Sequence, residues 1–496
     1  MSVNPNDLTP RQAWMPLSQS AWTEENARHL LRRIGFSAMP NEVENAMKRG
    51  LPMTVEHYFG KTHPFEIPYR LQRLVAEAPK IQQKIRKSKD EEEKRELRRE
   101  QRMMSDSAYQ DFAIKWLQFA REPENSPQEK YIMFLQDVFV VARSKVRATG
   151  YLFQHQNLMR REGFGRYSEL VKSVSRSPAM IQYLDLNRSS KKAPNENFAR
   201  ELFELFTLGE GNYTEKDIKE AARAFTGYRF RGGDYRFDKN AYDSGTKTVF
   251  GQTGLWNGDE IIDIVYQQPA AGTFVPKEFL RFYLSEQPLP EPYIERLADL
   301  WRNKGYDMRF LIETVFNSRI FYQPQYRGNL IKSPIHYYVG LCQDLNLDIA
   351  PFPSKVLSGL RGMGQIFQDP PNVRGWVGGK HWINTTTIAA RRQVAQALFT
   401  KINEENLNAD EYVDLQAARA NGRDAFVVTE DRLSGLTEES PEFIAEHFSR
   451  YFLPNPTGKR FQRTLTDYLK KSKKNYLSGI KDVAIAVLQS PQYQLS

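Results

Sequence analysis

The sequence predicts a mainly α fold, a compact multi-helix assembly with a small β-hairpin insertion and a charged helical arm. Apolar residues recur at three- and four-residue spacing through most of the chain, as on the buried face of a helix. With 496 residues and 40% hydrophobic content, the chain can bury a sizeable core. No linker and no reliable internal repeat divides it, so we expect residues 1–496 to form a single unit.

The composition excludes several classes of protein. The single cysteine, Cys342, rules out an intramolecular disulfide framework, and we expect it to be buried and structural. The formal net charge is +10, but acidic and basic residues are interspersed, so charge alone is weak evidence for binding to nucleic acid. The sequence has neither a signal-like N-terminal segment nor an apolar run of roughly 18 residues. We expect a soluble, cytoplasmic protein, or a periplasmic or extracellular one if a partner carries it or a leader was removed.

The first part of the chain predicts paired helices and an arm. Residues 23–34 begin with Thr23 as N-cap and end before Gly35, so both helix boundaries carry the usual residues, and a second helix follows over 41–49. Residues 71–102 are almost free of glycine and proline and carry charges of both signs. This pattern favours a solvated helical hairpin arm, and the alternative is a partner-docking surface.

The most informative stretch is residues 194–228, here called the PNEN segment, which predicts two helices joined by a tight turn. Asn195 follows a proline and suits the N-cap position, and the apolar residues after it leave only a narrow polar stripe. The stripe consists of Asn197, Arg200, Glu201 and Glu204. Because much of this helix is apolar, we expect these side chains to face other elements, with Arg200 paired to Glu196 and Glu204.

The turn of the PNEN segment carries standard boundary residues. Gly209 and Gly211 end the first helix, and Thr214 with Asp217 resembles a capping box that opens the second. The whole stretch, PNENFARELFELFTLGEGNYTEKDIKEAARAFTGY, resembles the hallmark segment of the bacterial DUF1800 family, a domain of unknown function. Similar phrases at both ends of the chain extend the resemblance over essentially the whole sequence.

Strand signals are confined to residues 228–251. The run YRFRGGDYRFD alternates aromatic residues around a Gly-Gly turn, and TKTVFG follows. We expect a short antiparallel hairpin inserted between helices.

Two positions depart from what the family resemblance implies. Relatives usually carry an FWHNHF segment that suggests metal binding, but residues 134–139 here are FLQDVF. Tyr242 likewise stands where relatives usually have a histidine. Because valine cannot coordinate a metal and glutamine does so poorly, we expect no metal site and no cofactor.

A second candidate region is residues 367–387, FQDPPNVRGWVGGKHWINTTT, here called the tryptophan loop. Loops dense in turn residues and aromatics often carry function because a rigid scaffold holds them over a cleft, although aromatic packing explains the pattern equally well. The candidate ligand-binding residues are Trp376, His381, Trp382, Asn384 and Thr385.

Two functions from different classes follow. The resemblance implies a partner, because DUF1800 genes commonly lie beside genes for DUF1501 proteins, which resemble sulfatases and alkaline phosphatases. We therefore expect an accessory protein that binds such a partner in folding, export or assembly. Binding to nucleic acid ranks last, because no basic stripe with interleaved aromatics is present.

The alternative function is a hydrolase of a glycan or ester, in a cleft between the PNEN segment and the tryptophan loop. Glu201 and Glu204 would be catalytic, since a buried glutamate with a raised pKa serves as a general acid or base. The ligand-binding groups would be Asn195, Asn197, Arg200 and the residues of the tryptophan loop. A purely structural hydrogen-bonded network is the competing interpretation of the same residues.

Overall fold

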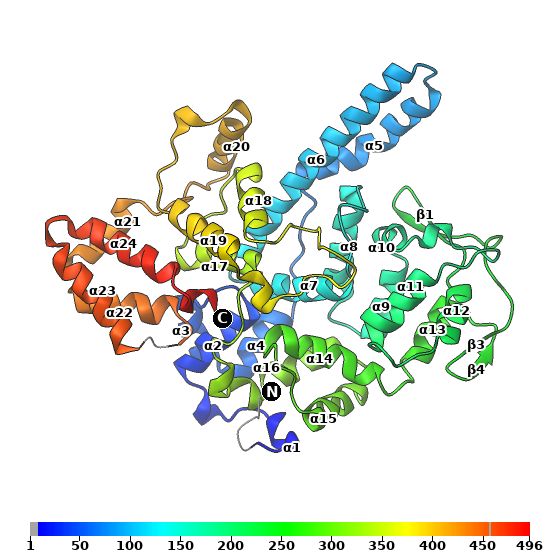
Figure 1. The fold of residues 1–496 in the computed structure, drawn as a ribbon, viewed down its shortest axis with the longest axis horizontal. Coiled ribbons are helices and arrows are strands. Elements are labelled where there is room, and N and C mark those ends of the chain that lie inside the picture. Colours follow the sequence, from blue (N-terminus) through cyan, green and yellow to red (C-terminus); the bar gives the residue numbers. More distant parts are fainter. Residues whose placement is uncertain (1–7, 456–457) are drawn as a thin grey trace.

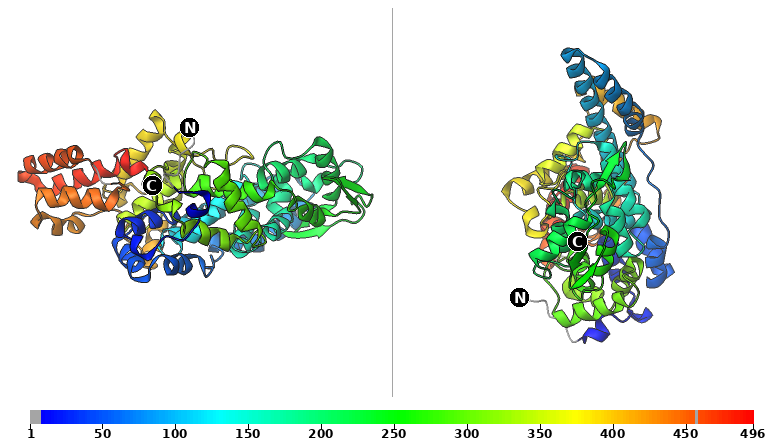
Figure 2. Two further views of the ribbon diagram at one scale, coloured as in Figure 1. Left: turned by 90° about the horizontal axis from the view of Figure 1, so that it is seen from below. Right: turned by 90° about the vertical axis from the view of Figure 1, so that its right-hand side faces the viewer.

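The computed structural model describes residues 8–455 and 458–496, and in these residues the fold is mainly α, as predicted. Strands are limited there to two small antiparallel hairpins (Figure 1). The body is elongated, with the hairpins at one end and the C-terminal helices at the other (Figure 2). None of the helices described combines the length and the apolar character that crossing a membrane requires.

The N-terminal helices form one side of the centre. They are α1 (Pro10–Ala13), α2 (Glu24–Ile34), α3 (Pro40–Arg49) and α4 (Leu51–Phe59). The side chain of Thr23 accepts a hydrogen bond from the main-chain N–H of Asn26, and Gly35 closes α2, which confirms both predicted boundaries.

A helical hairpin projects from the body (Figures 1 and 2). It consists of α5 (Tyr69–Lys87) and α6 (Glu91–Arg121), which pack against each other. Ile81 and Ile85 of α5 are buried, whereas most charged residues around the tip are exposed. Helix α6 continues past residue 102 into the body, where Trp116 is fully buried.

The middle of the chain supplies most of the central helices. They are α7 (Ser126–Val138), α8 (Thr149–Glu162), α9 (Tyr167–Ser175), α10 (Pro178–Tyr183), α14 (Ala271–Tyr283), α15 (Glu291–Arg302), α16 (Met308–Phe316) and α17 (Pro334–Asp344). Helix α7 is buried along nearly its full length, which agrees with its apolar sequence. Cys342 on α17 is buried, and burial raises the pKa of its thiol to about 12, so it is not a thiolate near neutral pH.

The PNEN segment contains a π-helical turn that its sequence pattern does not predict. Helix α11 (Glu196–Glu201) runs into a π-helix at Leu202–Thr207, and α12 (Glu215–Ala224) follows. The main-chain N–H of Leu208 donates to the carbonyl of Phe203, five residues back, at 2.8 Å. The predicted N-cap at Asn195 and the capping box of Thr214 with Asp217 are both confirmed.

Two hairpins follow the PNEN segment, followed by α13 (Gly258–Val265). Strands β1 (Tyr228–Arg231) and β2 (Asp234–Phe237) pair across Gly232 and Gly233, which both have positive φ, as a tight hairpin turn requires. The second hairpin pairs β3 (Lys247–Val249) with β4 (Gln252–Gly254), and it extends beyond the stretch in which the sequence shows strand signals.

The remaining helices form the C-terminal part. They are α18 (Pro353–Gly362), α19 (Thr385–Ala397), α20 (Ala409–Ala420), α21 (Glu430–Ser434), α22 (Pro441–Phe452), α23 (Lys459–Lys471) and α24 (Tyr476–Leu488). The buried apolar residues form two large clusters. One spans the N-terminal helices, α7 and the PNEN region, and the other spans α6, α17 and the C-terminal helices.

Candidate functional site

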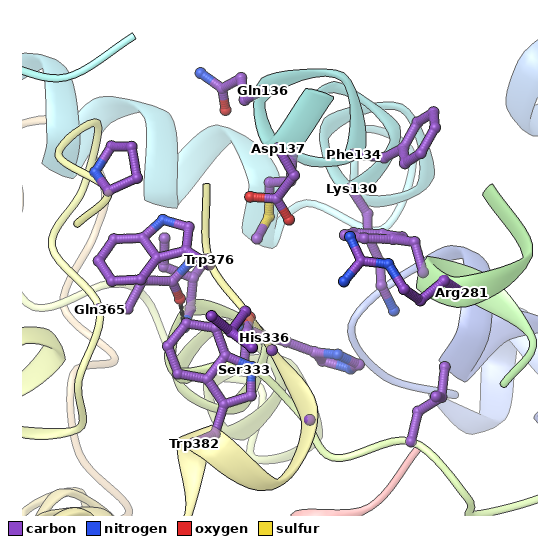
Figure 3. Close-up of a pocket in the computed structure, with 18 of the residues that line it drawn as sticks. Lys130, Phe134, Gln136, Asp137, Arg281, Ser333, His336, Gln365, Trp376 and Trp382 are labelled. Carbon is purple, nitrogen blue, oxygen red and sulfur yellow. Dashed lines mark hydrogen bonds between the residues drawn. The ribbon is translucent and has the colours of Figure 1, made fainter. Parts of the chain in front are cut away.

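A cavity of about 440 Å³ lies where the two hydrophobic clusters meet (Figure 3). Its wall includes Phe134 from the first cluster and Ile335 and Phe367 from the second. Most of its wall comes from α7, the end of α14, the start of α17 and the tryptophan loop, and Arg33 of α2 and Trp116 of α6 contribute as well. Ligand sites commonly form at such junctions because convergent side chains from separate elements line one space.

Asp137 is the carboxylate that α7 presents to this cavity. It lies in the last turn of the helix, where the helix dipole disfavours a negative charge. Burial raises the pKa of Asp137 to about 7, and the nearby carboxylate of Glu278 adds to the rise. The guanidinium of Arg281 and the main-chain N–H of Trp376 act in the opposite direction. Near neutral pH this group therefore exists in both protonation states.

Helix α14 supplies a second carboxylate and a cation. Glu278 and Arg281 lie three residues apart on one helix face, and their side chains form an ion pair with an N to O distance of 2.6 Å. Figure 3 shows the carboxylate of Asp137 and the guanidinium of Arg281 directed into the same space. The carboxylates of Asp137 and Glu278 thus line the cavity with Arg281 beside them.

The tryptophan loop closes one side of the cavity, and its glycines allow its main chain to lie close to α7 and to Glu286. Gly375 has a φ of 75°, and a Cβ added there would lie 3.1 Å from the main-chain oxygen of Asp137. A Cβ added at Gly379 would overlap the side-chain carboxylate of Glu286. The rings of Trp376 and Trp382 line the cavity with their centroids 5.6 Å apart.

Cations form another part of the wall. Lys130 on α7 donates to the carbonyls of Arg32 and Gly35, at 3.1 Å and 2.7 Å, and thereby caps the C-terminus of α2. Arg33 on α2 donates to the carbonyl of Tyr283 at 2.9 Å, and it is buried. All these contacts are to neutral oxygens.

Three polar atoms in the wall lack a partner among the described residues. The Nε atom of Arg33, the Nε2 atom of His336 and the Nε2 atom of Gln368 are buried without a hydrogen bond. Gln368 also has a φ of 54°, in the left-handed region that residues other than glycine rarely adopt. Unsatisfied groups and backbone strain together are typical of ligand-binding sites.

The structure places part of the predicted tryptophan loop site at this cavity. Trp376, His381 and Trp382 line it. Asn384 and Thr385 are exposed at the start of α19 and are not part of the wall, and the side chain of Asn384 caps that helix by accepting from the N–H of Thr387 at 2.9 Å.

The polar stripe of the PNEN segment lies outside the cavity wall. Glu204 accepts from Arg374 of the tryptophan loop at 2.8 Å and from the hydroxyl of Tyr213 at 2.7 Å. The expected pair of Arg200 with Glu204 is therefore wrong, because the π-helical turn changes the register between them. Arg200 instead binds Glu215 at 2.7 Å and approaches Glu196 at 3.6 Å, as predicted for Glu196.

The other predicted residues of the PNEN segment lie at its surface or cap it. Asn195 donates to the carbonyls of Leu184 and Asp185, and Asn197 is exposed. Glu201 is half-buried, and burial together with the charge of Glu204 raises the pKa of its carboxyl. The structure therefore joins this stripe to the tryptophan loop through Arg374 alone, among the contacts it records for the stripe.

Asp137, Glu278, Arg281 and His336 also line the cavity, and none of them was predicted as a site residue. A signal existed for Asp137, which stands as the single carboxylate in the apolar run YIMFLQDVFVV. In the described part of the chain, no group of three or more histidine, cysteine or acidic side chains is arranged to hold a metal ion.

Comparison with curated proteins and with solved structures gave no match. The family model described as a protein of unknown function, DUF1800, matches residues 29–495, nearly the whole length. The chain therefore belongs to the DUF1800 family.

Proposed function

We propose that the cavity is the active site of a hydrolase for a glycan or ester, with Asp137 as the general acid–base residue. The proposal rests on the position of this carboxyl in the cavity wall beside Arg281, together with its pKa of about 7. General catalysis is most effective when the pKa of the group lies near the working pH. A carboxyl group perturbed by burial inside a concave site is also a standard indicator of an active site.

The second carboxylate supports glycoside hydrolysis in particular. Such enzymes use two carboxyl groups on either side of the bond, one that protonates the leaving group and one that remains ionised. Asp137 suits the first role, and Glu278, beside Arg281, suits the second. The faces of Trp376 and Trp382 offer apolar surface on which the C–H groups of a sugar ring can pack.

A panel of 4-nitrophenyl glycosides and esters tests this proposal. We expect Asp137→Asn to lower the rate of any cleaved substrate by about 10²–10⁴-fold. Glu278→Gln should also lower it, whereas the matched variants Glu201→Gln and Glu204→Gln should not. Loss of activity in those two variants, with activity retained in Asp137→Asn, would instead favour the cleft beside the PNEN segment. Cleavage of no compound in the panel would count against the hydrolase.

A second candidate function is the binding of a protein partner, with a DUF1501-like protein as the proposed partner. The observation that favours it is the projecting hairpin of α5 and α6 (Figure 1). Apolar side chains are unusually exposed near its base: Tyr69 is 67% exposed, Val75 49% and Met103 62%. Exposed apolar groups on a projecting element are suited to docking.

Co-expression with a DUF1501 protein from the same genome tests the second candidate. We expect the two to purify together and Val75→Glu with Met103→Glu to abolish the association. Met53→Glu is the matched control, since Met53 is 61% exposed on α4, away from the hairpin. A partner that folds and purifies equally well in cells lacking this chain would contradict the proposal.

A further inference from the structure

One end of the cavity carries buried basic side chains that are not paired with a carboxylate. Arg33, Lys130 and His336 all line the cavity and are buried, with 1%, 5% and 5% of their surfaces exposed. Among the described residues, no ion pair and no hydrogen bond joins any of the three to a carboxylate. Arg33 and Lys130 instead donate to carbonyl and amide oxygens.

His336 is aimed into this space without a partner. It is the third residue of α17, and its position is fixed because Ser333 caps that helix. Its Nε2 atom makes no hydrogen bond of standard geometry to a described residue, although the main-chain carbonyl of Phe36 is near the imidazole and acts to raise its pKa. His336 and Lys130 both line the cavity, and in the view of Figure 3 the side chain of His336 lies between the ring of Trp382 and the side chain of Arg281. A buried imidazole nitrogen with no partner costs stability unless a ligand supplies one.

The electrostatics of this end favour a negative ligand. Burial and the nearby cations hold the pKa of Lys130 and the pKa of His336 well below their usual ranges. The side chains that lower the pKa of His336 are Lys130 on α7, Lys332 before α17 and Arg33 on α2, and all three are basic. Buried charges of one sign are unfavourable without compensation, and a ligand of opposite sign provides it.

We propose that this end of the cavity is an oxyanion subsite, in which His336 and Lys130 bind a carboxylate or phosphate group of the substrate. The inference rests on the proposed function for the reaction itself. It makes the substrate an acidic one, such as an acidic sugar or the ester of an acid, with its anionic group held at His336 and its reacting bond near Asp137. A bound anion favours the protonated imidazole, so Nε2 then donates to it, and binding weakens as the pH rises.

Binding of acetate and of inorganic phosphate tests the subsite, each compared with sodium chloride at equal ionic strength. Calorimetry should show saturable binding of at least one of the two probes to the wild-type protein. His336→Phe should weaken it by about tenfold or more, the effect expected for a hydrogen bond to a charged group. Lys380→Met is the matched control, because Lys380 is an exposed cation of the same cavity, and it should bind as the wild type does.

The two probes also define the substrate class. Stronger binding of acetate indicates a carboxylate, and stronger binding of phosphate indicates a phosphorylated substrate. Absence of saturable binding to either probe would overturn the subsite. Equal weakening by His336→Phe and Lys380→Met would overturn it as well, because that result indicates diffuse attraction to positive charge.

A direct measurement covers the case in which His336→Phe does not fold. In wild-type protein labelled with ¹⁵N at its histidines, saturating acetate or phosphate should move one Nε2 resonance toward the protonated form. No change in any histidine signal would contradict the proposal. Asp137→Asn should retain anion binding, so the two proposals can be tested separately. If the protein binds anions but hydrolyses nothing, only the proposed reaction is contradicted. If it hydrolyses a substrate but binds no anion, only the subsite is contradicted.

Discussion

The polar side chains of the PNEN segment are mostly paired with one another or with neighbours, whereas several of those that line the cavity are not. In the PNEN segment Arg200 binds Glu215 and Glu204 binds Arg374 and Tyr213, so most charges have a nearby partner. At the cavity, Asp137 is partly buried with a raised pKa, and Nε2 of His336 has no hydrogen bond of standard geometry among the described residues. The stretch by which the family is recognised, the PNEN segment, therefore lies outside the cavity that holds the candidate active-site residues.

The largest expected effect is the contribution of Asp137 to the pH dependence of the free energy of unfolding. Its carboxyl has a pKa of about 7 in the folded chain and about 3.9 in the unfolded chain, so the folded state binds the proton more tightly. Stability is therefore fully present below the lower value and is lost as the pH rises through the higher one. Asp137→Asn should remove this loss and be more stable than the wild type by roughly 2–4 kcal/mol at alkaline pH.

Urea denaturation across this pH range measures the effect. The wild-type and Asp137→Asn curves should converge at acid pH and separate toward alkaline pH. The control is Glu204→Gln in the PNEN segment, which should not remove the loss. Parallel curves for the wild type and Asp137→Asn would show that the carboxyl is not perturbed.

Glycines of the two regions offer the next comparison. A Cβ at Gly375 meets the main-chain oxygen of Asp137, whereas at Gly211 nothing described lies within 4 Å, and both residues have positive φ. Alanine at Gly211 should cost about 1–2 kcal/mol for the backbone conformation alone. Alanine at Gly375 should cost about 1–3 kcal/mol more, because the loop must move away from α7. Equal shifts of the denaturation midpoint for the two alanine variants would show that the tryptophan loop can move away from α7 at no cost in stability.

Breaking the ion pairs of Arg374, which link the two regions, should lower the free energy of unfolding by a smaller amount. Arg374→Met removes the ion pairs to Glu204 and Glu210, and since the side chain of Arg374 is 58% exposed, the loss should be about 0.2–1 kcal/mol. Because Arg374 lowers the pKa of Glu201, its removal should raise that pKa further. A titration followed by ¹³C NMR of the glutamate carboxyls tests this. Arg236→Met, on a hairpin, is the control and should leave Glu201 unchanged.

The smallest effect is expected within the PNEN segment. Arg200→Met breaks partly exposed ion pairs and should cost less than about 1 kcal/mol. Thermal denaturation measures it. A loss of several kcal/mol would reveal that the stripe is a buried network after all, and would make the contrast with the cavity weaker.

Local signals in the sequence predicted the fold well. Thr23, Asn195 and Thr214 cap their helices as expected, because capping depends on residues within one turn. The π-helical turn at Leu202–Thr207 was not predictable, since its apolar residues fit a regular helix equally well. That turn also explains why the pair of Arg200 with Glu204 was wrong.

The candidate site was predicted only in part. The tryptophan loop was found because its turn residues and aromatics are visible in the sequence, and three of its five candidate residues line the cavity. Asp137, Arg281 and His336 come from helices far apart in the chain. Their meeting depends on long-range packing, which periodicity and spacing do not encode. The raised pKa of Asp137 depends on the same packing.

The ion pair of Arg374 with Glu204 gives the family's hallmark segment a mechanical role. Arg374 immediately precedes Gly375, which rests on the end of α7, so one tether runs from the π-helical turn to the cavity wall. Replacing Glu204 by glutamine would remove that ion pair and release the tether. The hallmark segment would thus hold the tryptophan loop from outside the cavity, without contact to a bound ligand.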